Sequence, residues 1–368
     1  MPRRSRHAVA VLMLCLCASP HADAGCDFST IDAQMQAVLD ANALSGGAVL
    51  IGRRDGVLHE RFLGDYTADT VIPIASATKL LSATRIVQLA GRGTLDLDAP
   101  VSALLPQFTG IKATMTLRQM FSHTAGYGDD ENHPVLRTNQ PSLAAAVDTI
   151  ACCVDQPNAW TPGAQFAYGG ISMHIGGRMA EVATGQDWQQ GWQTAIGQPL
   201  GITSIDWQGL GPTLNYRISG SARSNLRDYG RVLQMLAADG VGNGRRVLDP
   251  ASLPQLFADQ VGSLPIAYAP PSAPPPGQLR YALGNWIESA PDAAGLATHS
   301  SLGAFGFFPW LDRTRGLYGV FMLRGGANIN ATARPVYLQM LQDARVLADS
   351  GTCTPVRTED PILRDGFE

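Results

Sequence analysis

Ser76 and Lys79 are the pair of residues whose types and spacing first suggest chemistry. They lie three positions apart, just after Pro73, where the sequence over residues 72–89 turns to good helix formers with apolar residues at helical spacing. Residues three apart share one face of a helix, so the Lys79 amine can reach the Ser76 hydroxyl. The pattern therefore predicts a serine near a helix N-terminus with an amine one turn further on.

The lysine itself is informative, because Lys79 and Lys112 are the two lysines among 27 basic residues. Arginine keeps its proton in a protein, whereas a desolvated lysine can lose its proton and act as a base. We therefore expect a neutral Lys79 amine to take the proton of Ser76 and make its oxygen a nucleophile. A lone S-x-x-K is more often a helix cap followed by a surface lysine, so the hypothesis depends on further motifs.

The elements that must hold this pair are strands near both ends of the chain and helices between them. Strand patterns over residues 46–53 and 57–63 flank an Asp-Gly hairpin turn at Asp55 and Gly56, and strand patterns return at 281–289, 305–311 and 316–323. Helical patterns cover residues 29–41, 117–121, 143–150, 171–184, 188–197, 226–238 and 331–349. We expect an α+β fold, in which an antiparallel sheet built from both termini is flanked by helices and carries an inserted, mostly helical domain.

The same patterns divide the chain into a leader, one large domain and a short tail. Residues 1–24 are typical of a secretory signal peptide, with arginines at positions 3, 4 and 6, an apolar run over 8–18 and an A-x-A site ending at Ala24. Residues 25–350 form the expected domain, with its sheet region at about 25–75 and 280–350 and its helical insert at about 91–279. Residues 351–368 are the tail. The leader predicts a periplasmic or secreted protein.

Composition narrows the range of partners. The net charge is -4, and removing the leader, which carries three arginines and one aspartate, changes it to -6. That mild acidity argues against a nucleic-acid partner. No run of about 18 apolar residues predicts a stable membrane anchor. The sequence contains no zinc-ligand spacing, P-loop or dinucleotide fingerprint, so we expect no metal and no cofactor. The oligomeric state stays open.

Four cysteines remain once the leader is removed: Cys26, Cys152, Cys153 and Cys353. An exported protein meets an oxidising compartment, in which an even number of cysteines favours disulfides. Cys26 opens the mature chain and Cys353 follows the last helical pattern, so one possible pairing joins the two ends. That pairing leaves Cys152 and Cys153 as a vicinal pair or as free thiols. The sequence by itself leaves the pairing open.

Four motifs occur in an order that one enzyme superfamily shares. The first is the S-x-x-K of residues 76–79. Residues 117–127 (LRQMFSHTAGY) resemble L-L-x-H-T-S-G, residues 162–170 (PGAQFAYGG) resemble P-G-x-x-F-x-Y-S-N, and residues 219–229 (SGSARSNLRDY) resemble G-G-L-x-S-T-A-x-D-L. The chain therefore resembles the serine β-lactamase-like hydrolases, which include D,D-peptidases, class C β-lactamases and family VIII-type esterases. The resemblance runs from about Leu44 to Leu347 and implies their α/β sandwich.

The resemblance also implies roles for particular residues. Tyr168 would bring its phenol to Ser76 and Lys79 as their acid and base partner. The backbone N–H groups of Ser76 and Ala304 would form an oxyanion hole. His123 belongs, in this family pattern, to a structural turn and not to the catalytic machinery.

The third site motif departs from the family pattern. Penicillin-recognising members carry K-T-G on the strand that lines the pocket, and esterase-like relatives often carry H-x-G. Here residues 298–310 read THSSLGAFGFFPW. We match Gly303 to the motif glycine, which places Ser301 at the Lys or His position; the other register starts at His299. In the preferred register the pocket is lined by Gly170, Ser301, Leu302, Gly303 and Phe305.

The second departure is Gly170, because related sequences place there an asparagine that donates to the substrate amide. Without that amide and the K-T-G cation, the amide and carboxylate of a β-lactam lose two binding groups. An ester needs an activated serine, an oxyanion hole and an apolar acyl pocket. We therefore expect hydrolysis of a small ester, amide or peptide through an acyl-enzyme. A β-lactamase or D,D-peptidase, and a catalytically silent binding relative, are the alternatives.

Overall fold

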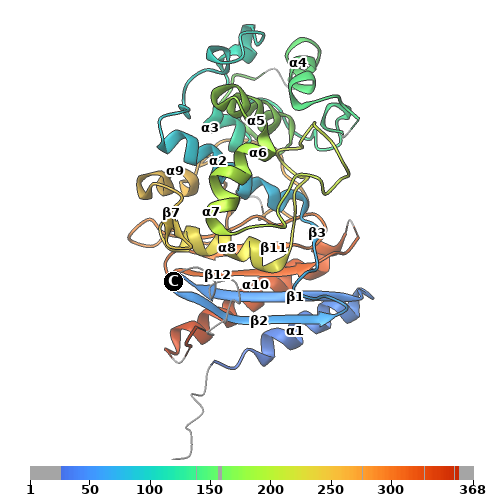
Figure 1. Cartoon of the computed structure of the whole chain (residues 1–368), viewed down its shortest axis with the longest axis vertical. Helices are drawn as coiled ribbons and strands as arrows, with labels where there is room; N and C mark the ends of the chain where they lie inside the picture. Colours follow the sequence, from blue (N-terminus) through green and yellow to red (C-terminus); the bar gives the residue numbers. More distant parts are fainter. Residues whose placement is uncertain are drawn as a thin grey trace, which may run out of the picture.

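The computed structural model describes residues 26–355, except residues 138, 156–159, 276, 327 and 352. The predicted signal peptide and most of the predicted tail lie outside the described residues. The view in Figure 1 shows a sheet near one end of the molecule, with α1 and α10 on one face and the remaining helices stacked on the other. Among the described residues, no helix combines the length and the apolar character that crossing a membrane requires.

The helices follow the predicted periodicity closely. Their bounds are α1 (Ser29–Ala41), α2 (Thr78–Gly91), α3 (Leu117–Phe121), α4 (Leu143–Cys153), α5 (Ile171–Thr184), α6 (Trp188–Trp192), α7 (Gln198–Leu200), α8 (Leu226–Ala237), α9 (Leu253–Phe257) and α10 (Ile329–Asp349). A single turn of 3-10 helix, η1 (Ala75–Ala77), leads directly into α2.

The strands form one large sheet and three small pairs. Their bounds are β1 (Gly46–Arg53), β2 (Gly56–Gly64), β3 (Ile72–Pro73), β4 (Phe166–Ala167), β5 (Arg223–Ser224), β6 (Val241–Gly242), β7 (Arg245–Arg246), β8 (Ile266–Tyr268), β9 (Trp286–Ile287), β10 (Thr298–Ser300), β11 (Phe308–Asp312) and β12 (Leu317–Leu323). The predicted strand over residues 281–289 is mostly loop, because only Trp286–Ile287 pair in register with β10.

The large sheet joins the two ends of the chain, which confirms the predicted α+β architecture. Its strand order is β2-β1-β12-β11-β10-β9, and every neighbouring pair is antiparallel. In the centre β1 runs beside β12, so that Val49 faces Phe321 across the ladder. The N-terminal hairpin can therefore form locally, whereas the central pairing requires segments about 270 residues apart to meet.

Both faces of the central strands are buried, and each face serves a different core. On β1, Ala48 and Leu50 pack with helices of the helical part, whereas Val49 and Ile51 pack against α1 and α10. Alternate residues of a strand point to opposite faces, so an unbroken apolar run such as AVLI suits a strand covered on both sides. The helix α8 lies on the first of these faces, where Gly230 sits close to the side chain of Leu50.

Two disulfides resolve the cysteine pairing that the sequence left open. Cys26 pairs with Cys353, which joins the start of the described chain to its end, and Cys152 pairs with Cys153 at the end of α4. The terminal disulfide lies beside α1 and α10, where Cys353 packs in the same apolar cluster as both helices. This disulfide therefore links the two ends of the described chain, both of which contribute strands to the large sheet.

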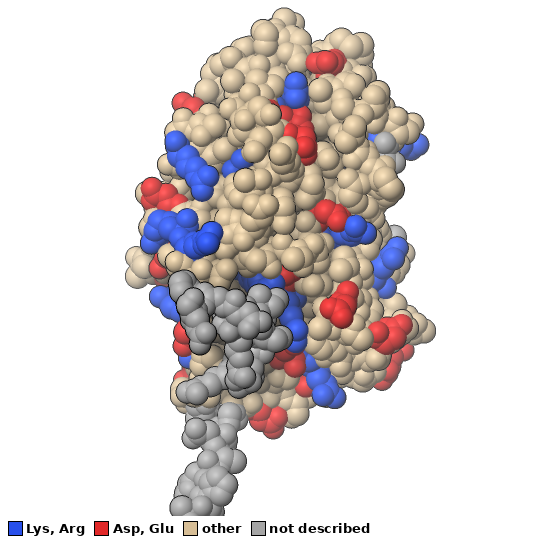
Figure 2. Space-filling view, in the orientation of Figure 1, with Lys and Arg blue, Asp and Glu red and all other residues tan. Residues whose placement is uncertain are grey.

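Charged side chains are spread over the surface. On the face shown in Figure 2, lysines and arginines alternate with aspartates and glutamates, and no broad patch of one sign appears there. The expectation that the protein binds no nucleic acid stays a prediction.

Candidate active site

Ser76 lies where the sheet half meets the helical half. It occupies the 3-10 turn η1, and its side chain is partly exposed although nearly all of α2 beyond it is buried. The segment before it is held by the 219–229 motif, because Ile74 donates its N–H to the carbonyl of Ala222 at 3.0 Å. Ala75 has a φ of +47°, an uncommon conformation for a residue with a side chain. The nucleophile candidate thus stands on a sharply bent, well-anchored turn.

Lys79 is the best-buried ionisable group at this turn, with 1% of its side chain exposed. Its Nζ lies 3.1 Å from the Oγ of Ser76, 2.8 Å from Oε1 of Glu131 and 3.0 Å from the carbonyl oxygen of Ser219. The predicted one-turn contact between the lysine and the serine is therefore present in the structure. The amine points into the protein and not into bulk water.

The sequence predicted a neutral Lys79 amine, and this prediction is wrong. Burial lowers the pKa of its amine, as the sequence argument assumed, but the charge of Glu131 and the Tyr168 side chain outweigh burial, so the pKa is raised. Lys79 is consequently an ammonium ion at rest. The sequence argument missed this because it contained no partner for the lysine.

Glu131 and Arg217 are the site residues that sequence reasoning missed. Glu131 comes from the loop after α3, and its other oxygen pairs closely with Nη2 of Arg217. Burial raises the pKa of Glu131, but the charges of Lys79 and Arg217 overcome this and lower it to about 2. The sequence signal closest to Glu131 is Gly170, which stands where the family pattern has an asparagine; a Cβ placed there would be in ordinary contact with Oε2 of Glu131, at 3.5 Å.

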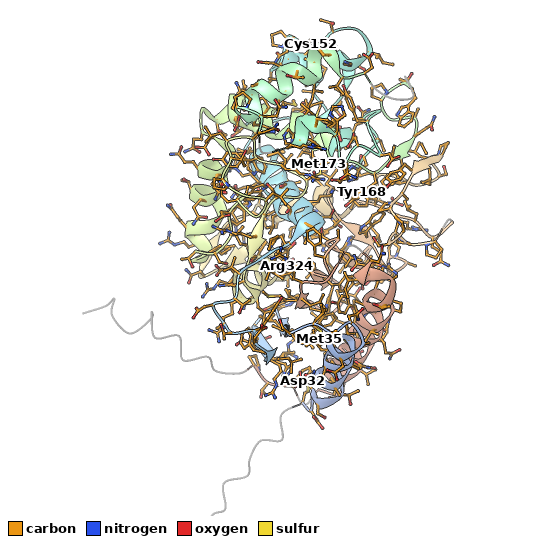
Figure 3. The ribbon with its side chains drawn as sticks, turned by 90° about the vertical axis from the view of Figure 1, so that its right-hand side faces the viewer. Asp32, Met35, Cys152, Tyr168, Met173 and Arg324 are labelled. Atoms are coloured by element: carbon orange, nitrogen blue, oxygen red, sulfur yellow. A yellow bond between two sulfur atoms is a disulfide. The ribbon has the colours of Figure 1, made fainter. Side chains whose placement is uncertain are left out.

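Tyr168 also contacts the Lys79 amine. The Lys79 Nζ lies 4.4 Å from the centre of the Tyr168 ring, and a hydrogen bond with the Tyr168 side chain helps to raise the pKa of the lysine. The ring stacks on Trp286 with centroids 5.4 Å apart. Figure 3 shows Tyr168 near the middle of the molecule, just below Met173 and far from Cys152. The structure therefore brings together the three residues predicted to carry catalysis.

His123 contacts the residues on either side of Tyr168 in the chain, and it also contacts Tyr281. Its Nε2 lies 3.2 Å from the hydroxyl of Tyr281, its Nδ1 accepts from the N–H of Gly169, and its carbonyl accepts from Ala167. Burial, followed by the charge of Lys79, holds the pKa of His123 well below its ordinary value, so the ring is neutral. These contacts agree with the structural role that the family pattern implied.

The third motif lies beside Ser76 in the register with Gly303 at the motif glycine. Ser301 donates its hydroxyl to the carbonyl oxygens of Ser76 at 3.2 Å and Gly284 at 3.3 Å. A Cβ at Gly303 would come within 2.2 Å of the carbonyl oxygen of Ile74, so a glycine is required there. His299 is buried in the core and pairs through Nδ1 with Asn285 at 2.8 Å. The geometry favours the register that matches Gly303.

The residues next to Gly303 in the chain differ in how far they are exposed. Ala304 is exposed, and within the described residues its backbone N–H has no hydrogen-bond acceptor, as an oxyanion donor requires. Phe305 is partly exposed. Leu302 is a correction to the predicted pocket: it is 6% exposed and packs in the core cluster shared with α1 and α10, because the chain direction turns it to the far face of the sheet.

No group of three or more His, Cys, Asp or Glu side chains suited to a metal ion occurs in the part of the chain that the structure describes. The groups that the described residues bring to the site comprise a partly exposed hydroxyl, a buried ammonium, a phenol, a carboxylate and the free backbone N–H of Ala304. This combination is typical of serine hydrolases that form acyl-enzymes.

The comparisons with known proteins agree with this class. Residues 31–341 match the family model described as Beta-lactamase, and the chain belongs to that family. A crystal structure from Bacteroides dorei, assigned provisionally as a β-lactamase, is 32% identical with a TM-score of 0.76, covering 87% of this chain and 99% of the other. A family VIII carboxylesterase structure, 17% identical with a TM-score of 0.69, covers 88% of this chain and 98% of its own, and shares the fold.

The curated relatives match a smaller part of the chain. Penicillin-binding protein 4 of Amycolatopsis lactamdurans is 33% identical over 42% of this chain and 43% of its own length. Esterase EstB of Burkholderia gladioli is 27% identical over 48% of this chain and 51% of its own. Monacolin J acid methylbutanoyltransferase of Aspergillus terreus is 33% identical over 38% of each chain. The chain thus spans about half or less of these relatives and belongs to a family of serine hydrolases with esterase members.

Proposed function

We propose that this chain is an exported serine hydrolase that cleaves the ester or amide bond of a small substrate through an acyl-enzyme on Ser76. The observation that carries the proposal is the 3.1 Å approach of the buried Lys79 ammonium to a serine that is itself partly exposed. A serine cap followed by a surface lysine would leave the amine in water. Here the amine is dry and the hydroxyl is accessible, which is the arrangement that nucleophilic catalysis needs.

The reaction has two balanced halves. In the first, the Oγ of Ser76 bonds to the substrate carbonyl carbon, and its proton passes to the pair formed by Lys79 and Tyr168, which in the reactive form carries one proton fewer than an ammonium with a phenol. The bond from the carbonyl carbon to the leaving alcohol or amine then breaks, and the leaving group departs with that proton. In the second, water gives a proton to the same pair and its oxygen bonds to the acyl carbon, while the bond from Ser76 breaks. The serine recovers a proton and the free acid leaves. Both halves follow from general acid–base catalysis by one side-chain pair.

The backbone supplies the oxyanion hole in this proposal. The N–H groups of Ser76 and Ala304 would point at the carbonyl oxygen as it gains charge. Removing one such donor costs about 3 kcal/mol in other serine hydrolases, so the hole contributes strongly to the rate. The close approach of Gly303 to Ile74 supports this placement, because it brings the chain of Ala304 against the turn that carries Ser76.

An ester is the favoured substrate class because the recognition groups for a β-lactam are altered. Gly170 offers no side-chain amide, and the space beside it is taken by Leu136, Ser219 and Glu131. Ser301 replaces the cation of K-T-G, and its hydroxyl is engaged by two backbone carbonyls. The esterase EstB among the relatives supports the same choice. A β-lactamase or D,D-peptidase is the second candidate, since Penicillin-binding protein 4 is also a relative.

Export is part of the proposal, on the evidence of the leader and the disulfides. The signal-peptide pattern of residues 1–24 predicts secretion. The two disulfide pairings support an oxidising compartment, because disulfides rarely persist in the cytosol.

Acylation of the purified mature protein tests the proposal. A fluorophosphonate probe should add its mass to the peptide containing Ser76, and a p-nitrophenyl ester should be turned over faster than a chromogenic cephalosporin. Faster cephalosporin turnover would favour the β-lactamase. No labelling by fluorophosphonate or penicillin, with no hydrolysis of either substrate, would identify the chain as a silent binding relative.

A further inference from the structure

A carboxylate from another loop lies close to Gly170, beside the side chains that fill the space there. A Cβ at Gly170 would meet Oγ of Ser219 at 2.7 Å, Cδ1 of Leu136 at 2.8 Å and Oε2 of Glu131 at 3.5 Å. Where the family pattern has an amide donor, this chain therefore presents an acceptor. Glu131 is a quarter exposed and Arg217 a fifth exposed, so the ion pair between them lines the site and is not a remote core pair.

The hydrogen bonds of Lys79 match those of an ammonium ion. Three oxygen atoms, from Ser76, Glu131 and Ser219, lie 2.8 to 3.1 Å from its Nζ. Two of these oxygens, those of the Glu131 carboxylate and the Ser219 carbonyl, only accept hydrogen bonds, whereas the Ser76 hydroxyl can accept or donate. An ammonium has no lone pair and cannot take a proton, and the loss of its charge would leave the Glu131 carboxylate facing a weaker donor. The 2.8 Å contact with the carboxylate therefore favours the charged form.

We propose that Glu131, clamped by Arg217, is a positioning residue that keeps Lys79 an ammonium ion and so assigns the serine proton to Tyr168. This inference rests on the proposed hydrolase function and deepens it. In acylation the reactive form has Tyr168 as a phenolate, whose oxygen takes the proton from the Oγ of Ser76 and then passes it to the leaving group, which restores the phenolate. The Lys79 cation stabilises the negative charge on the tyrosine oxygen and keeps its own protons throughout the cycle.

The other charged and titratable groups near Lys79 do not replace Glu131. His123 is neutral, because burial and the lysine charge hold its pKa well below the ordinary value. Burial raises the pKa of Asp130 to about 6, and its Oδ1 already accepts from the N–H groups of Gly170 and Ile171. Arg217 carries a charge of the same sign as the lysine. Glu131 is thus the carboxylate in direct contact with the amine.

Glu131→Gln gives opposite results under the two assignments of the base. The amide keeps the shape and removes the negative charge, so burial of Lys79 then dominates and lowers its pKa. If the ammonium is required, the alkaline limb of the kcat/KM profile for a p-nitrophenyl ester moves to lower pH by roughly one unit or more. If neutral Lys79 is the base, the acid limb moves to lower pH and activity rises on that side. This second result, or an unchanged profile, would overturn the proposal.

The two lysines of the chain allow a direct measurement that does not depend on activity. Protein labelled with 13C at the lysine side chains gives two sets of signals, from Lys79 and Lys112. In the wild-type protein the Lys79 signals should stay in the charged form beyond the ordinary lysine pKa of about 10.4, and in Glu131→Gln they should titrate earlier. Wild-type Lys79 titrating near neutral pH would contradict the proposal. Lys112 is the internal reference, because it lies in a separate 3-10 helix, Gly110–Thr114, against the end of α4.

Two further variants separate a charge effect from a loss of folding. Glu181→Gln removes another mostly buried glutamate that pairs with an arginine, Arg178 at 2.9 Å, but lies towards the far end of α5. It should leave the pH profile and the Lys79 signals unchanged. Glu131→Asp keeps the charge and should restore part of the wild-type profile.

Fluorophosphonate labelling of Ser76 keeps the two proposals distinguishable. A wild-type protein that neither labels nor hydrolyses any substrate refutes the hydrolase function. A labelled, active wild type whose Lys79 signals and pH limbs are unmoved by Glu131→Gln refutes the role of Glu131 alone.

Discussion

The two walls of the candidate site come from different halves of the molecule and contribute different kinds of group. The sheet wall, residues 301–305 after β10, meets the serine turn through backbone atoms: Gly303 approaches the carbonyl of Ile74, and Ser301 donates to the carbonyl of Ser76. The helical wall contributes charged and phenolic side chains, with Glu131 and Tyr168 gathered around Lys79.

This difference indicates a division of labour in the site. The sheet wall is a scaffold for backbone donors, so its tolerance to change should depend on space. The helical wall controls where protons reside, so changes there should alter pH dependence as well as rate. The serine turn belongs to neither wall alone, because β3 before it pairs with β5 and α2 after it is buried among helices.

The largest expected effect comes from the serine that both walls serve. Ser76→Ala removes the nucleophile, and loss of such a group in a serine hydrolase lowers kcat by about 10⁵ to 10⁶. The measurement is ester hydrolysis together with the adduct mass after fluorophosphonate treatment. Residual activity within about tenfold of the wild type would show that the acyl-enzyme forms elsewhere or not at all.

Tyr168→Phe tests the helical wall. The phenyl ring keeps the stacking on Trp286 but loses the oxygen that carries the proton, so kcat should fall by about 10² to 10⁴. Tyr281→Phe is the matched control: it removes a buried hydroxyl that contacts His123 in the same aromatic cluster. The control should lose stability and keep most of its rate. Equal losses of kcat in both variants would argue that Tyr168 has only a packing role.

Gly303→Ala tests the sheet wall by steric means. The added methyl would lie 2.2 Å from a backbone oxygen, so the strand end or the serine turn must shift. We expect a loss of about 1 to 3 kcal/mol in unfolding free energy and a smaller fall in kcat than for Tyr168→Phe, with unchanged pH limbs. Gly326→Ala, at a glycine with open space around it, is the control. A shifted pH profile in Gly303→Ala would contradict the proposed division of labour.

The smallest effect on catalysis is expected far from both walls. Replacing Cys26 and Cys353 by serine removes the cross-link between the chain ends, which should lower the unfolding free energy by about 2 to 5 kcal/mol. Denaturant unfolding with and without reductant measures this loss. The esterase pH profile at moderate temperature should be unchanged, since the disulfide lies in the core cluster of α1 and α10. A changed pH profile would mean that the active site depends on the disulfide between the chain ends.

The sequence predicted most of the local structure and the first half of the site. The spacing of Ser76 and Lys79, together with the helix-forming residues that follow, was enough to place an amine against a hydroxyl, because that contact depends on one turn of helix. The helix over 171–184 and the strand over 46–53 were likewise local patterns. The charge on the lysine was not local, and its prediction was wrong.

Local residue order determined which groups are available for catalysis, and the tertiary structure decided their protonation and orientation. Burial alone would lower the pKa of Lys79, yet the charge of Glu131, 52 residues away in sequence, helps to raise it. Arg217, 86 residues from Glu131, pairs with the other oxygen of that carboxylate. Leu302 shows the same limit for orientation: it follows β10, and its side chain packs in the core cluster of α1 and α10 instead of in the predicted pocket. Charge interactions and burial sum over all neighbours in space, and a linear pattern does not contain those neighbours.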